Sequence, residues 1–168
     1  MKIEIKNYEK QMYEFIDELN KIGTTGDRRY MILFFGIYSE YLINELLRVR
    51  LPKVNFLDIN SQSLKLKILL SHSILSDKTY EVLQKLNQVR NEYAHNLMFD
   101  SGKINKWAKE TPLNWNVEGG EESLKKIEEE LSKNLLDRFE KICLSNIIFL
   151  FQNLGGFPKK DNPKKIGE

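Results

Sequence analysis

Apolar side chains recur every three or four residues along most of the chain, which is the spacing of one face of an α-helix. This spacing predicts helices over about 6–22, 27–50, 61–72, 77–98 and 121–153. No stretch alternates apolar and polar residues as a strand does, and no internal repeat is present. The sequence therefore predicts an all-α, up-and-down bundle of about five helices.

Residues with strong positional preferences mark where these helices begin and end. Gly23 is expected to stop the first helix, and Thr25 or Asp27 to cap the second. Pro52 requires the second helix to end before it. After a break at 73–76, Asp77 is expected to cap the fourth helix.

The second helix carries two neighbouring apolar stripes, more than one face of a small bundle usually needs. They are Met31, Phe35, Tyr38, Leu42, Leu46 and Val49, and beside them Tyr30, Phe34, Ile37 and Tyr41. A helix with so wide an apolar arc is either central to a bundle or shared between the core and a subunit interface. We therefore expect a two-fold homodimer.

The only long irregular segment is predicted at 99–120, where both tryptophans lie. Trp107, on a short helical turn, and Trp115 either anchor this segment to the core or stack on bases. The last helix has a charged first half and an apolar second half, and Gly155-Gly156 ends it. We expect one domain over 1–156, followed by a basic flexible tail over 157–168.

Composition restricts the classes of function. The chain has 168 residues, 41% hydrophobic and 30% charged, with a net charge of +2. The 157–168 tail holds four lysines against two acidic residues and so accounts for the excess, which leaves the body neutral, and no broad clamp for duplex DNA is expected. Cys143, the single cysteine, lies in an apolar helical run and is expected to be a buried, inert thiol.

Two histidines, His72 and His95, are too few for a three-histidine metal site, and we expect neither a metal nor a cofactor. His72, near the end of its helix, is expected to cap that helix. The N-terminus has no apolar signal core, and the longest apolar run, 30–38, is too short to cross a bilayer. We expect a cytoplasmic protein without membrane contact.

One short segment, Arg90-Asn91-Glu92-Tyr93-Ala94-His95, concentrates polar chemistry on a mostly apolar helix. Asn91 and His95 are one turn apart and share a face. Arg90 lies about 140° around the axis from His95 on ideal helical geometry. A kink near His95, or a second copy of the helix from another subunit, would bring the two side chains together.

This set contains the parts needed to cleave RNA through its own 2′-hydroxyl. Arginine binds a phosphate with a planar cation, histidine exchanges protons near neutral pH, and Asn91 orients either group without adding charge. The structural alternative is that Arg90 pairs with Glu92 or with an acid of another helix, while His95 caps or packs.

The same segment resembles the Arg-x4-His signature of the HEPN superfamily, with Asn91 as the polar residue that follows the arginine. The stretch from about Gly26 to Asp100 also resembles the mannitol operon repressor family, which has a HEPN-type fold. The segments that carry this second resemblance are Glu45-Leu46-Leu47, Ser63-Leu64-Lys65-Leu66-Lys67, Ile74-Leu75-Ser76, Val89–His95 and Phe99-Asp100.

The two resemblances imply different functions. Catalytic HEPN domains are homodimeric, metal-independent ribonucleases that act as toxins or defence effectors, usually beside an antitoxin. This implies RNA as substrate, with Arg90 on the scissile phosphate, His95 as general acid or base and Asn91 in a positioning role. Mannitol-repressor-like proteins are regulators, which implies a non-catalytic transcriptional or protein-interaction role. Many toxin motifs have a tyrosine shortly after the histidine, where this chain has Asn96-Leu97-Met98.

Three further residues could support this site: Glu40, Gln88 and Glu92. Gln88 extends the polar face of Asn91 and His95, and Glu92 is the acidic residue within the segment. Glu40 belongs to the stripe of Arg29, Leu33, Gly36, Glu40, Asn44 and Arg48, which is expected to face solvent or the rim. The alternative is that Glu40 faces the fourth helix and pairs with Arg90 or His95.

Overall fold

The computed structural model describes residues 7–25, 28–53, 59–95, 101–111 and 120–155. These residues form helices and contain no strand, so the predicted all-α class is confirmed. In chain order the helices are α1 (Tyr8–Thr25), α2 (Arg28–Arg50), α3 (Gln62–Ser71), α4 (Asp77–His95), α5 (Ser101–Glu110), α6 (Gly120–Leu131) and α7 (Leu135–Asn153).

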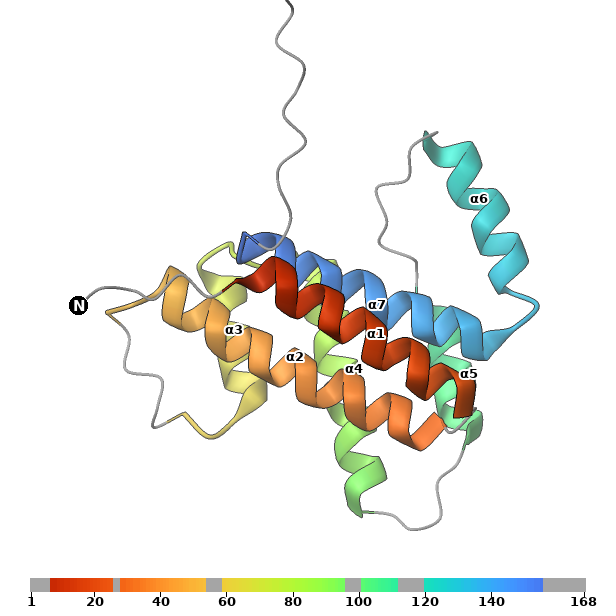
Figure 1. Cartoon of the computed structure of the whole chain (residues 1–168), viewed down its shortest axis with the longest axis horizontal. Coiled ribbons are helices and arrows are strands. Elements are labelled where there is room, and N and C mark those ends of the chain that lie inside the picture. Colours follow the sequence, from red (N-terminus) through yellow and green to blue (C-terminus); the bar gives the residue numbers. More distant parts are fainter. Residues whose placement is uncertain (1–6, 26–27, 54–58, 96–100, 112–119, 156–168) are drawn as a thin grey trace, which may run out of the picture.

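Two long helices, α2 and α7, form the centre of the bundle and make its most extensive helix pair. Helix α1 runs beside both of them, and α4 packs against α2, α3 and α7. Helix α5 covers the end of α7, whereas α6 extends away from the body of the bundle (Figure 1). Figure 1 also shows the last turns of α4 continuing past α2.

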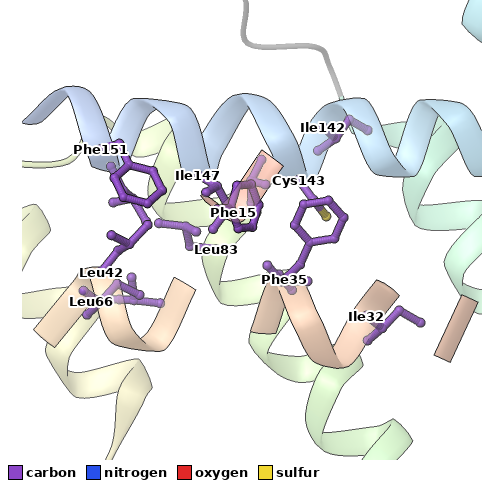
Figure 2. Packing of buried hydrophobic residues seen from close by; sticks show 14 of the residues in the cluster. Phe15, Ile32, Phe35, Leu42, Leu66, Leu83, Ile142, Cys143, Ile147 and Phe151 are labelled. Atoms are coloured by element: carbon purple, nitrogen blue, oxygen red, sulfur yellow. The ribbon is translucent and has the colours of Figure 1, made fainter. Parts of the chain in front are cut away.

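The core lies between these helices as one contiguous cluster of buried apolar residues. Figure 2 shows Phe35 of α2 directed toward Cys143 of α7, and Leu42 of α2 at the end of α7 where Phe151 lies. Phe15 of α1 is fully buried, with its ring centroid 5.1 Å from that of Phe34. Burial of this apolar surface is the main force that holds the bundle together.

A buried polar cluster joins the first turn of α1 to the last turns of α2. The Tyr8 hydroxyl donates to Glu45 Oε2 at 2.7 Å, and Arg48 Nη2 donates to the same oxygen at 2.8 Å. Burial, followed by the neighbouring Glu45 carboxylate, raises the pKa of Tyr8 to about 12. The carboxylate is tolerated inside because two donors satisfy it.

Arg138 of α7 connects three helices from a buried position. Its Nε donates to the carbonyl oxygen of Ala108 at 2.6 Å, and its Nη2 to that of Thr111 at 2.9 Å. These carbonyls lie at the C-terminal end of α5, where helix carbonyls lack partners within the helix and a cation is favourable. Glu128 of α6 lies 3.5 Å from Nη2.

The predicted bounds of the second helix agree with α2, but Gly23 does not stop the first helix. Helix α1 continues to Thr25, and Gly23 is exposed, with nothing within 4 Å of a Cβ placed there. Thr25 therefore lies inside α1 and does not cap α2, and Asp27 lies outside the described residues. A glycine near an exposed helix end destabilises the helix only through its low helix propensity. This cost is too small to prevent α1 from continuing to Thr25.

The break between α3 and α4 is where the sequence predicts it. Ser61 caps α3 and its side chain accepts from Leu64 N, but the residue that caps α4 is Ser76 rather than Asp77. The Ser76 hydroxyl accepts from Thr79 N at 3.2 Å, and Asp77 is the first helical residue. An acidic residue there still favours the helix through its dipole.

The predicted irregular segment at 99–120 is wrong for residues 101–110, which form α5, and only the short helical turn expected at Trp107 is confirmed there. Its apolar residues Ile104, Trp107 and Ala108 are spaced as one helical face and are buried. Trp107 anchors this segment in the core, as expected, with its ring edge against Phe139 at 5.2 Å between centroids. The described residues do not include 96–100 or 112–119, and Trp115 belongs to the second of these ranges.

The single helix predicted over 121–153 is two helices. Helix α6 ends at Leu131, and α7 begins at Leu135 after a turn over 132–134. The Asn134 side chain accepts from Asp137 N at 3.4 Å, which caps α7. The end near Gly155 is confirmed, since α7 stops at Asn153 and Gly155 has a positive φ of 85°. The tail at 157–168 lies outside the described residues.

The two apolar stripes of α2 have different environments. Met31, Phe35, Leu42 and Leu46 are buried, whereas Tyr30 and Ile37 of the second stripe are 66% and 62% exposed. Helix α2 is therefore central to the bundle and also leaves part of its apolar surface uncovered.

Candidate functional site

The end of α4 presents an exposed polar face on a helix that is otherwise anchored in the core. Its buried residues, Val82, Leu83, Leu86 and Val89, recur with helical spacing. Gln88, Asn91 and His95 lie away from this face and are exposed. The sequence thus holds one side of α4 against α2, α3 and α7, and leaves the other side accessible to a ligand.

Arg90 does not join this exposed face, because its side chain is directed toward α2 and α3. Its Nη2 donates to Glu40 Oε2 at 3.2 Å, Gln62 Oε1 at 3.0 Å and Asn87 Oδ1 at 3.2 Å. A terminal guanidinium nitrogen has two hydrogens, so at least one of them is shared between two acceptors. The side chain is 24% exposed.

The guanidinium is therefore held through one terminal nitrogen, Nη2. All three hydrogen bonds use Nη2, while Nη1 has no partner among the described residues. Nε is buried and also lacks a partner there. Such an arrangement holds the plane of the cation in place while a terminal nitrogen can still bind an external oxyanion.

Gly36 makes the close approach of Arg90 to α2 possible. Gly36 is buried, and a Cβ placed on it would lie 2.6 Å from Arg90 Cγ and 3.3 Å from Arg90 Cβ. Any side chain at position 36 would therefore displace the arginine stem. The stripe of α2 that contains Gly36 was expected to face solvent or the rim, and at Gly36 this is wrong because Arg90 covers it.

The three predicted catalytic residues thus lie in two places. Arg90 leaves α4 toward α2, whereas Asn91 and His95 lie on the exposed side of its last two turns. This agrees with the angle of about 140° that helix geometry gives for Arg90 and His95. Within one chain the cation and the imidazole are neighbours along α4 rather than a bonded pair.

The three predicted supporting residues also have different surroundings. Glu40 forms an ion pair with Arg90 at 3.2 Å, and its side chain is 40% exposed, so it lies at the rim and also contacts α4. Glu92 pairs with Lys103 of α5 at 3.2 Å, where both side chains are well exposed and contribute little. Gln88 is exposed. The pair of Arg90 and Glu40 also agrees with the structural alternative, in which Arg90 pairs with an acidic residue of another helix.

Sequence reasoning missed Gly36, Gln62 and Asn87 as contacts of Arg90. Gly36 had a detectable signal, since it lies one turn from Glu40 in a helix of large apolar residues. Asn87 lies one turn before Arg90 on α4, which places it on the same side. Nothing near Gln62 indicates the contact, because it depends on how α3 docks against α4.

The cysteine and the second histidine have structural roles. Cys143 is fully buried, and burial raises the pKa of its thiol, as expected for an inert cysteine. His72 Nδ1 lies 2.9 Å from the carbonyl oxygen of Ile68, so His72 caps α3 as predicted. No three His, Cys, Asp or Glu side chains among the described residues are grouped as metal ligands.

In the described part of the chain, no helix has the length and apolar character needed to cross a bilayer. Comparison with protein-family models, with curated proteins and with solved structures finds no match to this chain.

Proposed function

We propose that this protein is a metal-independent endoribonuclease of HEPN type, with Arg90, Asn91 and His95 as its active-site residues. The observation that carries the proposal is the arrangement of Arg90. Its guanidinium is held through Nη2, its Nη1 is not engaged by any described residue, and the exposed Asn91 and His95 lie next to it on α4. A preorganised cation and an accessible imidazole on the same helix supply the groups for phosphodiester cleavage, and a second copy of α4 would bring them together.

The proposed reaction takes its nucleophile from the substrate. His95 accepts the proton of the ribose 2′-hydroxyl, whose oxygen bonds to phosphorus as the bond from phosphorus to the 5′-oxygen breaks. The 5′-oxygen takes up a proton from a solvent water, and His95 returns its own proton to solvent, which leaves a 2′,3′-cyclic phosphate and a 5′-hydroxyl. Arg90 stabilises the negative charge that develops on the phosphoryl oxygens, and Asn91 orients the imidazole or a phosphate oxygen.

A homodimer would combine these groups across two copies of α4. Ile37 of α2 is exposed and apolar, and it lies one helical turn from Glu40, the partner of Arg90. A second copy that covers Ile37 would therefore reach the neighbourhood of Arg90. Light scattering of the wild type should give a dimer at micromolar concentration, and Ile37→Asp should give a monomer. A monomeric wild type would contradict this part of the proposal.

The decisive experiment compares cleavage of an RNA and a DNA of matched sequence, with and without EDTA. We expect RNA to be cut in both conditions and DNA to resist. His95→Ala and Arg90→Ala should each reduce the rate by about 10²–10⁴-fold. His72→Ala is the matched control, because it removes the other histidine from an exposed helix end. Metal-dependent cutting, or equal cutting of DNA, would show that this chemistry is wrong.

The second candidate is a non-catalytic regulator or protein-interaction module, as in mannitol-repressor-like proteins. It is favoured by the exposed Tyr30 and Ile37 and by a depression of about 350 Å³ that residues of α1 and α2 line. The lining residues are Gln11, Glu14, Ile37, Tyr38 and Tyr41. Partner-binding surfaces are typically apolar and aromatic in this way. A protein that cuts no RNA under any condition would favour this candidate.

A further inference from the structure

Three features that are unfavourable to stability meet at one side chain. Gly36 lies in the middle of a long helix, and Gln62 Nε2 and Arg90 Nε are buried with no partner among the described residues. Natural proteins retain such features where function requires a specific geometry. We call Gly36, Glu40, Gln62 and Asn87 the Arg90 cradle, because each contacts the arginine.

Gly36 is the part of the cradle that determines where the arginine stem lies. Glycine inside a helix is unfavourable relative to alanine, because it loses more conformational freedom on folding. Its benefit here is space, since a Cβ at this position would overlap Arg90 Cγ at 2.6 Å. The overlap involves the stem rather than the flexible end, so it cannot be relieved without moving the whole side chain.

Gln62 is the part of the cradle that comes from α3. It is the first residue of α3, where polar side chains usually face water, yet it is 7% exposed. Its Oε1 accepts from Arg90 Nη2 at 3.0 Å, while its buried Nε2 has no partner among the described residues. A buried amide that is only half satisfied is destabilising, so its contact with Arg90 is the feature that accounts for it.

We propose that Gly36 and Gln62 are positioning residues for Arg90. Gly36 admits the stem against α2, and Gln62 fixes the guanidinium from α3. They set the location of the cation without contacting substrate. The consequence for catalysis rests on the proposed function, whereas the positioning itself does not.

The catalytic consequence is tested with Gly36→Ala in the full chain. We expect kcat for RNA cleavage to fall by about 10²-fold, since small displacements of an active-site group have effects of this size. Gly23→Ala is the matched control, because Gly23 is also helical but has nothing within 4 Å of an added Cβ, and it should retain wild-type kcat. In an Arg90→Ala background, Gly36→Ala should cause no further loss, because the group it displaces is already absent.

A thermal denaturation cycle tests the positioning without any activity. Once Arg90→Ala has removed the clash, Gly36→Ala should raise the midpoint by about 2–4 °C, as expected for alanine in place of a helical glycine. In the wild-type background the same change should lower the midpoint or leave it unchanged. Equal shifts in both backgrounds would overturn the role of Gly36, whether or not the protein cuts RNA.

Gln62→Leu provides the second variant if Arg90→Ala does not fold. Leucine removes the acceptor together with the unsatisfied amide nitrogen, so the thermal midpoint should stay the same or rise while kcat falls by about tenfold. Restoration of the rate by Gln62→Glu, which keeps an acceptor, would support positioning. Wild-type kcat in Gln62→Leu would overturn it. A wild type without RNase activity that still shows the coupled thermal shifts would refute the proposed function alone.

Discussion

Replacement of Arg138 by alanine should be among the most destabilising changes at a polar residue of this bundle. Its side chain is 8% exposed and donates two hydrogen bonds to carbonyls at the end of α5. Hydrogen bonds from a charged group contribute about 1.5–3 kcal/mol each. Water can reach part of the helix end, and Glu128 is 39% exposed, so we expect a loss near the lower limit, about 3 kcal/mol.

Urea unfolding followed by circular dichroism measures this loss. For a domain of this size, about 3 kcal/mol corresponds to a fall in melting temperature of about 6–12 °C. Arg50→Ala is the matched control, because Arg50 also donates to a carbonyl, that of Asn153 at 2.7 Å, but from an exposed position. Its loss should stay below about 1 kcal/mol. Equal losses in the two variants would refute the idea that burial makes the Arg138 contacts strong.

Two further predictions concern the core and the alkaline limit of stability. Phe15→Ala should destabilise the protein by about 3–5 kcal/mol in urea unfolding, whereas Tyr13→Ala, at a position 56% exposed on the same helix, should change it by less than about 0.5 kcal/mol. The pKa of Tyr8 is raised to about 12 by burial and then by Glu45, so the folded state keeps a proton that the unfolded chain loses near pH 10. The free energy of unfolding should therefore decline between pH 10 and 12, and Tyr8→Phe should flatten that decline; an unchanged pH profile would contradict the assignment.

Periodicity alone predicted much of the bundle, because long amphipathic helices carry a strong signal. The bounds of α2 follow from its apolar stripes and Pro52, and the break before α4 follows from the polar residues around Asp77. The division between α6 and α7 was missed. Both halves favour helix, and only the side-chain cap at Asn134 marks the turn.

Helix α5 was predicted only as a short helical turn at Trp107, and its full length was missed for a different reason. Among its residues 102–110 only three are buried, too few to distinguish a short helix from a loop when glycines and a proline lie nearby. Its position depends on tertiary contacts, namely the buried Trp107 and the bonds from Arg138 to its C-terminal end. Neither contact can be read from local spacing.

The candidate site was predictable only along α4. Helical geometry alone places Asn91 and His95 on one face and Arg90 on another, and the structure agrees. The contact with Glu40 followed from one of two alternatives for α2. Gly36 offered only the signal of a small residue one turn from Glu40, and the contact with Gln62 could not be predicted, because it depends on the depth and angle at which the helices pack.

The place of α7 in the bundle has a consequence for the newly made chain. Helix α7 is the last described helix to be synthesised, yet it forms the most extensive contacts of α2. At about 5–20 residues per second, α2 leaves the ribosome several seconds before its main partner. During this interval only α1 and the helices made in between can shield side chains such as Phe35 and Leu42. The nascent protein therefore exposes an apolar surface that is buried in the folded molecule. Chaperones that bind apolar segments should bind it at this stage of translation.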